Sequence, residues 1–194
     1  MAYTICSEKQ RTQEWLNARK GLITGSIVSA IIGNNRYLTD PHQITATILG
    51  MQIMENIPMQ IGNAVEDQIR SLYTAITGNS VKEIGFVRWD VDSRFGASAD
   101  GIVNDDGLLE IKYTRSRDVV SYLKNSKFND IIYPSHMDQI NFTCGILGLM
   151  YCDYVVYSDV YSEHTLYIRR IAFSPSYFEY QLSKGREFYD KYLT

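Results

Sequence analysis

Cysteine is scarce in this sequence, which has only Cys6, Cys144 and Cys152 among its 194 residues. Their number is odd and no two of them form a C-x-x-C pair, so cysteine alone can assemble neither a disulfide framework nor a zinc or iron–sulfur site. We therefore expect the three thiols to stay reduced and to behave as small apolar side chains.

Long apolar runs are also missing. Runs such as 27–33 and 146–151 fall far short of the roughly 20 residues that a helix needs to cross a bilayer. The first ten residues lack the basic start and the apolar core of a secretory signal. These absences predict a soluble protein that stays inside the cell that makes it and has no membrane partner.

The sequence has no excess of positive charge and no linker. A formal net charge of −3 and a pI near 5.6 argue against nucleic-acid binding by bulk electrostatics. One stretch differs, with five basic side chains against a single acid: Lys112, Arg115, Arg117, Lys124 and Lys127 against Asp118. It predicts either a basic arm on an acidic body or a solvated face. Because no repeat or Pro/Gly/Ser-rich tract interrupts the chain, residues 1–194 are expected to form one domain.

Apolar periodicity divides the chain into helices and strands. Helical spacing with caps, glycines or prolines at the ends predicts helices at 12–21, 25–33, from 40 onward, 62–78, 135–147 and from 174 onward. Short or alternating apolar runs predict strands at 81–87, 88–92, 101–103, 108–112, 151–157 and 165–173. This order indicates an α/β or α+β fold, with one central mixed sheet flanked by helices.

The segment 62–78 is the clearest of these helices. Its apolar stripe consists of Val65, Ile69, Leu72 and Ile76. Glu66 lies at the edge of the stripe rather than on the opposite face, so we expect this carboxylate to look toward the sheet.

A predicted hairpin with residues 104–107 as its four-residue tip carries the chemistry. Side chains alternate along a strand, so Glu110 and Lys112 project from one face of the second strand. With this tip Gly101 lies opposite Glu110, which places Asp100 within one diagonal neighbour of that carboxylate. Two carboxylates and a lysine therefore converge.

Unpaired carboxylates this close repel each other, and a divalent cation would relieve the repulsion. Hard oxygen ligands suit Mg²⁺, which can polarise a phosphoryl oxygen and lower the pKa of bound water. Lys112 would then orient the attacking water, and Glu66 would complete a site for one or two ions. The alternative is an ordinary charged hairpin, because such residues also occur together by chance.

Five short motifs follow one another along the chain: Glu14-Trp15-Leu16-x-x-Arg19-x-Gly21-x-Ile23-Thr24-x-Ser26, Gly62-Asn63-x-x-Glu66, Ser98-Ala99-Asp100-Gly101, Leu109-Glu110-Ile111-Lys112 and His136-x-x-Gln139. In this order and spacing the sequence resembles the lambda-type phage exonucleases and YqaJ-like viral recombinases, a branch of the PD-(D/E)xK nuclease superfamily. The resemblance covers most of the chain and implies a restriction-endonuclease-like core. Ala99 departs from the superfamily's proline, which shapes only the turn before the aspartate.

The resemblance implies a Mg²⁺ site, with Mn²⁺ as a substitute, whose ligands are Asp100, Glu110 and the backbone carbonyl of Ile111, with Glu66 binding the same or a second ion. Lys112 would position the attacking water, and Gln139 would brace this water and the lysine. His136 is expected to stabilise the structure rather than to bind metal.

The resemblance also implies a pocket for the 5′-phosphate of DNA, formed by Arg19 and Ser26 with Ser98. A helix N-terminus with a hydroxyl group suits an anion, and a guanidinium group can clamp it with two hydrogen bonds. Arg117 matches a further phosphate-binding arginine of the family only with a one-residue gap.

The implied activity is a Mg²⁺-dependent 5′-to-3′ exodeoxyribonuclease on linear double-stranded DNA, which releases 5′-mononucleotides and leaves 3′ single strands for viral or phage-type recombination. Such enzymes commonly form ring trimers and work with a single-strand annealing protein, in a bacterial cytoplasm or where viral DNA replicates. A structure- or sequence-specific endonuclease and a non-catalytic DNA-binding module remain alternatives. An iron–sulfur nuclease would need four cysteines, and there are three.

Overall fold

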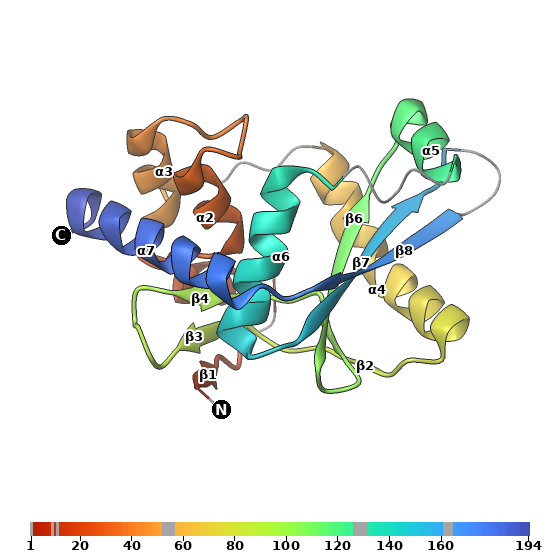
Figure 1. Ribbon diagram of the computed structural model, residues 1–194, viewed down its shortest axis with the longest axis horizontal. Coiled ribbons are helices and arrows are strands. Elements are labelled where there is room, and N and C mark those ends of the chain that lie inside the picture. The colour runs from red at the N-terminus through yellow and green to blue at the C-terminus, as the bar shows by residue number, and fades with distance from the viewer. Residues whose placement is uncertain (1, 9, 11, 52–56, 126–131, 161–164) are drawn as a thin grey trace.

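The structure, a computed structural model, describes residues 2–8, 10, 12–51, 57–125, 132–160 and 165–194 (Figure 1). The helices are α1 (Gln13–Arg19), α2 (Gly25–Ile32), α3 (Pro41–Ile48), α4 (Ile57–Thr77), α5 (Arg117–Lys124), α6 (Pro134–Leu147) and α7 (Pro175–Tyr192). The strands are β1 (Tyr3–Ile5), β2 (Val81–Lys82), β3 (Val87–Trp89), β4 (Gly96–Ala97), β5 (Gly101–Val103), β6 (Gly107–Tyr113), β7 (Tyr151–Ser158) and β8 (Thr165–Ala172). Within these ranges no helix has both the length and the apolar character of a membrane span.

The larger sheet has the strand order β2-β5-β6-β7-β8. Its neighbours run antiparallel except for β6 and β7, which are parallel. A parallel pair needs a crossover connection, and the chain between β6 and β7 supplies it with α5 and α6. The expected α+β fold with a central mixed sheet is thereby confirmed.

Helices α4 and α6 cover opposite faces of this sheet. Ile69 of α4 shares an apolar cluster with Leu109 and Ile111 of β6. Ile140 of α6 belongs instead to the cluster that contains Leu108. Because side chains alternate along a strand, the even-numbered residues of β6 face α6.

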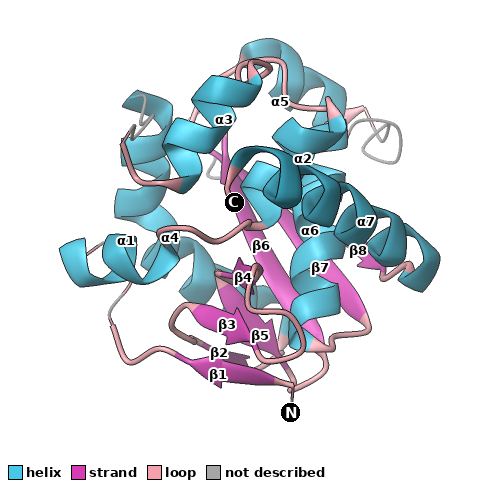
Figure 2. Ribbon diagram, turned by 90° about the vertical axis from the view of Figure 1, so that its left-hand side faces the viewer, coloured by secondary structure: helices cyan, strands magenta, loops and turns pink. Residues whose placement is uncertain are grey.

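The smaller sheet has the order β1-β3-β4 and lies at the end of the molecule where the N-terminus is found (Figure 2). Ile23, just before α2, bridges to Phe95. The amide of Gly96 also donates to the carbonyl of Ile23 over 3.1 Å. These bonds fix the start of α2 beside β4, and thus near the segment that leads to Asp100.

The expected strands at 81–92 prove to lie in two different sheets. β2 joins the larger sheet, whereas β3 joins the smaller one. The chain crosses between them at Gly85, where an added Cβ would come within 2.3 Å of the Cys6 carbonyl oxygen. Only glycine allows this close passage.

Two further features differ from the sequence prediction. Ile76 does not complete the buried stripe of α4, because its side chain is 59% exposed and the fully buried Tyr73 fills the core one turn earlier. Part of the basic stretch forms the helix α5, whose cap Ser116 accepts from the amide of Val119 over 3.3 Å, whereas Lys112 lies on β6. Lys127 of that stretch lies outside the described residues.

The predicted register of the hairpin is wrong by one residue. Gly101 pairs with Leu109 rather than with Glu110. The loop contains three residues, 104–106, and the first two have the positive φ angles that Asn and Asp tolerate better than most residues. Extending the observed register places Asp100 directly opposite Glu110, closer than expected.

Candidate active site

The candidate site begins where β5 stops pairing with β6. Asp100 immediately precedes β5, and its Oδ2 accepts a 2.7 Å hydrogen bond from the amide of Ile111. The aspartate side chain thus satisfies a strand amide that lies beyond the last paired residue of β5. This bond fixes the Asp100 carboxylate beside the peptide that follows Glu110.

Glu110 is buried on the face of β6 that looks toward α6, with only 1% of the residue exposed. Its Oε1 accepts from Lys112 Nζ at 2.5 Å and from Gln139 Nε2 at 2.7 Å. Its Oε2 is buried, and no described residue donates a hydrogen bond to it. An unsatisfied buried carboxylate oxygen is costly, so this atom is a candidate ligand for a cation.

The groups around Glu110 shift its pKa in opposite directions. Burial raises the pKa of Glu110 to about 7, Lys112 counteracts this, and the carboxylates of Asp100 and Glu66 add to it. Burial by itself would lower the pKa of Lys112, but Glu110 and Asp100 outweigh it and raise that pKa above its ordinary value. This direction keeps Lys112 a cation at neutral pH, and its Nζ donates to Glu110 in the structure.

Gln139 connects α6 to this cluster. Its Nε2 donates to Glu110, and its Oε1 lies 3.5 Å from Lys112 Nζ. His136, one turn earlier on α6, bonds through Nδ1 to the hydroxyl of Tyr154 at 2.8 Å. Burial and the charge of Lys112 lower the pKa of His136 to about 3, so the ring is neutral at physiological pH. These contacts are compatible with the structural role expected for His136.

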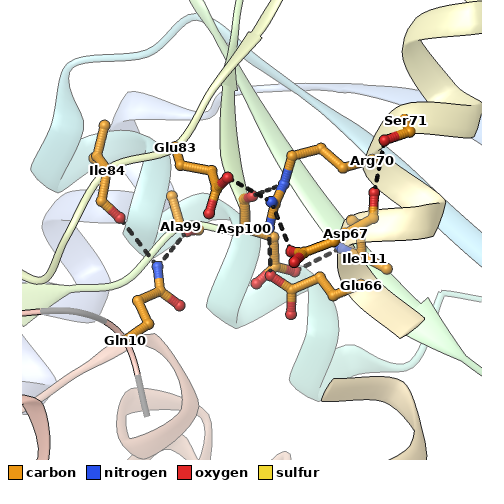
Figure 3. Close-up of polar contacts among 10 residues, drawn as sticks. All are labelled: Gln10, Glu66, Asp67, Arg70, Ser71, Glu83, Ile84, Ala99, Asp100 and Ile111. Carbon is orange, nitrogen blue, oxygen red and sulfur yellow. Dashed lines mark hydrogen bonds and ion pairs between the residues drawn. The ribbon is translucent and has the colours of Figure 1, made fainter. Parts of the chain in front are cut away.

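Glu66 reaches the site from α4, as expected from its place on that helix. It is 7% exposed, and its Oε1 accepts from Arg70 Nη2 at 2.8 Å. Arg70 also donates through Nε to the backbone carbonyl of Asp100 at 3.1 Å. Figure 3 shows Glu66, Asp100 and Ile111 gathered beside this arginine.

Sequence reasoning missed Arg70. The available signal was the Glu66-x-x-x-Arg70 spacing, which puts an acid and a base on the same face of a helix. The contact of Arg70 with Asp100 joins residues 30 positions apart, and no local pattern indicates it.

The residues present fit a divalent cation only in part. Among the described residues no three His, Cys, Asp or Glu side chains form a ready-made metal cage. The orphaned Oε2 of Glu110, beside the carboxylates that raise its pKa, nevertheless supplies the hard, negative oxygen that Mg²⁺ prefers. Since Mg²⁺ usually keeps several water ligands and binds proteins through one or two carboxylates, an incomplete cage is compatible with this ion.

The expected phosphate-binding residues are more dispersed. The guanidinium group of Arg19 lies 4.1 Å from the centre of the Trp15 ring, and no ion pair links it to a described carboxylate. Ser26 is exposed in the first turn of α2. The Oγ of Ser98 is buried and has no hydrogen-bond partner among the described residues. Arg117 is exposed at the start of α5.

A close packing contact connects α2 to the carboxylate cluster. A Cβ added at Gly25 would lie 3.0 Å from both the Cγ and the backbone oxygen of Gln139. Ser26 is therefore next in sequence to a residue that touches Gln139. Hydrogen bonds, some of them through Arg70, bring together the residues Glu66, Asp100, Glu110, Ile111, Lys112 and Gln139. Within the described part of the chain, no hydrogen bond or ion pair joins Arg19 or Arg117 to them.

Comparison with solved structures identifies exonucleases of similar fold. An alkaline exonuclease from Laribacter hongkongensis, LHK-Exo, is 26% identical, with a TM-score of 0.79 over 93% of this chain and 92% of that one. Its complex with dAMP gives 27% identity with the same TM-score and coverage. A phage-related exonuclease from Haemophilus somnus 129PT, at 13% identity, shares the fold with a TM-score of 0.70 over 91% of this chain and 96% of that one.

A search of curated proteins gave no significant match. The profile of the YqaJ-like viral recombinase domain, in contrast, matches residues 14–148. This range extends from the first motif past Gln139 and so contains the whole carboxylate cluster. The chain belongs to the YqaJ-like viral recombinase domain family.

Proposed function

We propose that this chain is a Mg²⁺-dependent 5′-to-3′ exodeoxyribonuclease that degrades linear double-stranded DNA into 5′-mononucleotides and leaves 3′ single strands for recombination. The observation that carries the proposal is the buried cluster where β6 extends past β5. There Asp100 binds the amide of Ile111, and Glu110 binds Lys112 and Gln139. The family and the similarity to an alkaline exonuclease solved with dAMP support the same activity.

The proposed metal ligands are Asp100, Glu110 and the carbonyl of Ile111, with Glu66 binding the same or a second ion, and Mn²⁺ would substitute for Mg²⁺. The chemistry that a bound metal supplies is polarisation of the scissile phosphate and a lower pKa for a water ligand. The unsatisfied Oε2 of Glu110 supports this assignment.

The other proposed catalytic residues act on water and on one another. Lys112 is protonated and can donate a hydrogen bond to the attacking water, which fixes the direction of its attack. Gln139 holds the Glu110 carboxylate through Nε2 and leaves its carbonyl oxygen beside Lys112. Each group is held by the other two, so the cluster is preorganised.

The proposed pocket for the 5′-phosphate contains Arg19, Ser26 and Ser98, with Arg117 as a further contact. Ser98 lies two residues before Asp100, and its buried hydroxyl has no hydrogen-bond partner among the described residues, which supports its place in the pocket. Arg19 supports it because stacking on Trp15 holds a guanidinium group that no described carboxylate neutralises. A terminal phosphate carries more negative charge than an internal one, so such a pocket favours DNA ends.

The proposed assembly is a ring trimer that encloses DNA and hands its product to a single-strand annealing protein, inside a bacterial cytoplasm or where viral DNA replicates. The acidic net charge of −3 supports a ring, because topology would retain DNA that bulk attraction does not. Residues 1–194 are proposed to act as one nuclease domain.

One experiment tests the proposed activity. Purified protein with Mg²⁺ is incubated with linear and closed-circular DNA labelled at either 5′ or 3′ ends, and Asp100→Ala serves as the inactive control. We expect mononucleotides from the 5′ end of linear DNA only, and no product with excess chelator. Cleavage of closed circles would indicate an endonuclease, and DNA binding without any cleavage would indicate a non-catalytic module.

A further inference from the structure

The guanidinium group of Arg70 binds residues of the candidate site and two acidic residues beside it. Its side chain is 11% exposed. The Nη2 atom donates to Glu66 at 2.8 Å, the Nε atom to the carbonyl of Asp100 at 3.1 Å, and Nη1 contacts Asp67 at 3.0 Å and Glu83 at 2.9 Å. All three guanidinium nitrogens are therefore engaged (Figure 3).

These contacts join three segments that are separate in the sequence. Glu66 and Asp67 lie on α4, Asp100 precedes β5, and Glu83 follows β2. A guanidinium group is planar, and its donors point in fixed directions, so it sets the spacing between its partners as well as their charge balance. Arg70 thus connects the helix that carries one proposed ligand to the strand that carries another.

Arg70 holds Asp100 in a way that leaves the carboxylate available. The arginine binds the backbone carbonyl of Asp100, whereas the Oδ2 of that residue accepts from the amide of Ile111. Asp100 is consequently fixed from two directions, and the positive charge of Arg70 does not occupy its side chain.

We infer that Arg70 is a positioning residue for the proposed metal site, which sets the distance and orientation of Glu66 relative to Asp100. The inference rests on the proposed function, because it concerns the metal ligands named there. Lysine at this position keeps the charge but cannot direct three nitrogens to three segments. Arg70→Lys should therefore fold and yet hold the two ligands loosely.

The test compares Arg70→Lys with Arg94→Lys, a matched control. Arg94 contacts Asp92 through two nitrogens at 2.8 Å and Asp190 through a third at 3.1 Å, and it contacts none of the proposed metal ligands. Calorimetry measures the affinity for Ca²⁺, and DNA cleavage measures the Mg²⁺ concentration at half-maximal rate and the rate at saturating Mg²⁺.

We expect Arg70→Lys to weaken Ca²⁺ binding about tenfold, the scale of one charged hydrogen bond. The half-saturating Mg²⁺ concentration should rise by a similar factor, with most of the rate regained at saturation. Arg94→Lys should lower the melting temperature but keep the Ca²⁺ affinity of the wild type. A folded Arg70→Lys protein with wild-type Ca²⁺ affinity would overturn the inference.

A second variant covers the case in which Arg70→Lys does not fold. The double variant Asp67→Asn/Glu83→Gln removes two exposed partners of Arg70 and should weaken Ca²⁺ binding by at least threefold. The control is Asp105→Asn/Glu179→Gln, which also removes two negative charges, from exposed positions on the hairpin loop and on α7. It should leave the Ca²⁺ affinity unchanged. Equal losses in both double variants would mean that charge alone matters, and the inference would be wrong.

The two proposals fail separately in this design. Wild-type protein that binds Ca²⁺ but never cleaves DNA would overturn the nuclease, while the calorimetric comparison would still decide the role of Arg70. If the protein cleaves DNA and Arg70→Lys binds Ca²⁺ as tightly as the wild type, the proposed function stands and only the positioning role is overturned.

Discussion

Glu110→Gln is expected to remove the loss of stability that the carboxyl group of Glu110 causes in metal-free protein between pH 5 and 8. The carboxyl group is 1% exposed, and its pKa is raised from an ordinary 4.5 to about 7, first by burial and then by Asp100 and Glu66. A raised carboxyl pKa means that the folded state holds the proton more tightly than the unfolded state. The stabilisation is therefore complete below about pH 4.5 and is lost as the pH rises through 7.

The size of the effect follows from the two pKa values. The difference between about 7 and 4.5 corresponds to about 3 kcal/mol, of which about 2 to 3 kcal/mol is lost between pH 5 and 8. Glutamine has a similar shape and cannot ionise, so the variant lacks this loss. The pKa of Lys112 is raised from 10.5, so its titration lies above the window. The lowered pKa of His136 makes stability rise with pH up to about 6.5, but both proteins share this change, so the prediction concerns the difference between them.

Urea unfolding followed by circular dichroism, at pH 5 and pH 8 with excess chelator, gives the free energies of unfolding. The wild type should lose about 2 to 3 kcal/mol more than Glu110→Gln between the two pH values. Glu179→Gln, which removes an exposed carboxylate from α7, should behave like the wild type. Mg²⁺ should restore stability at pH 8 in the wild type only. Equal pH slopes for wild type and Glu110→Gln would refute the reasoning.

Three further predictions concern turnover, DNA ends and assembly. Lys112→Ala should cleave DNA at least about 100-fold more slowly and still bind Ca²⁺ at pH 8, as measured by calorimetry. Loss of Ca²⁺ binding would instead indicate that the lysine supports the structure of the site. Arg19→Ala and replacement of the 5′-phosphate by a hydroxyl should each slow initiation by roughly tenfold to a hundredfold without adding to each other; full additivity would separate Arg19 from the phosphate. Light scattering should give three times 22.3 kDa, and a monomer that degrades long DNA processively would exclude the ring.

Helix ends were predictable from sequence because their signals are local. Thr12 accepts from the amide of Trp15 at 3.2 Å, and Asp40 caps α3 by accepting from the amide of His42 at 3.0 Å. Gly33 ends α2 with a φ of 93°. In each case a residue within a few positions completes the hydrogen bonding or the backbone turn, so the pattern is visible in the sequence.

The short strands were not predictable, because their partners are distant in sequence. β1 pairs with β3 more than 80 residues later, and β4 has two residues, too few to show any period. The register error has the same origin on a smaller scale. The composition of the hairpin loop indicates a turn, but whether it holds three or four residues depends on the positive φ angles adopted by Asn104 and Asp105.

The carboxylate cluster was predicted as a set, whereas its internal bonding was not. Strand alternation placed Glu110 and Lys112 on one face, and the structure agrees, with 2.5 Å between Nζ and Oε1. The sequence could not indicate that Asp100 satisfies the amide of Ile111, because this depends on where β5 ends. The assignment of these residues to catalysis stays a prediction for the experiments above.

The contact between Gly25 and Gln139 fixes the distance between the start of α2 and the carboxylate cluster. A Cβ at residue 25 would come within 3.0 Å of the Gln139 backbone oxygen and 3.1 Å of Thr143 Oγ1, so the start of α2 packs directly against α6. In the proposed mechanism a 5′-phosphate bound at Ser26 is held at a set distance from the Glu110 carboxylate that Gln139 grips. Each cleavage exposes a new 5′-phosphate, and the strand must advance by one nucleotide for this phosphate to reach the same place. If the 5′-phosphate binds at Ser26 as proposed, this fixed spacing favours the removal of single nucleotides.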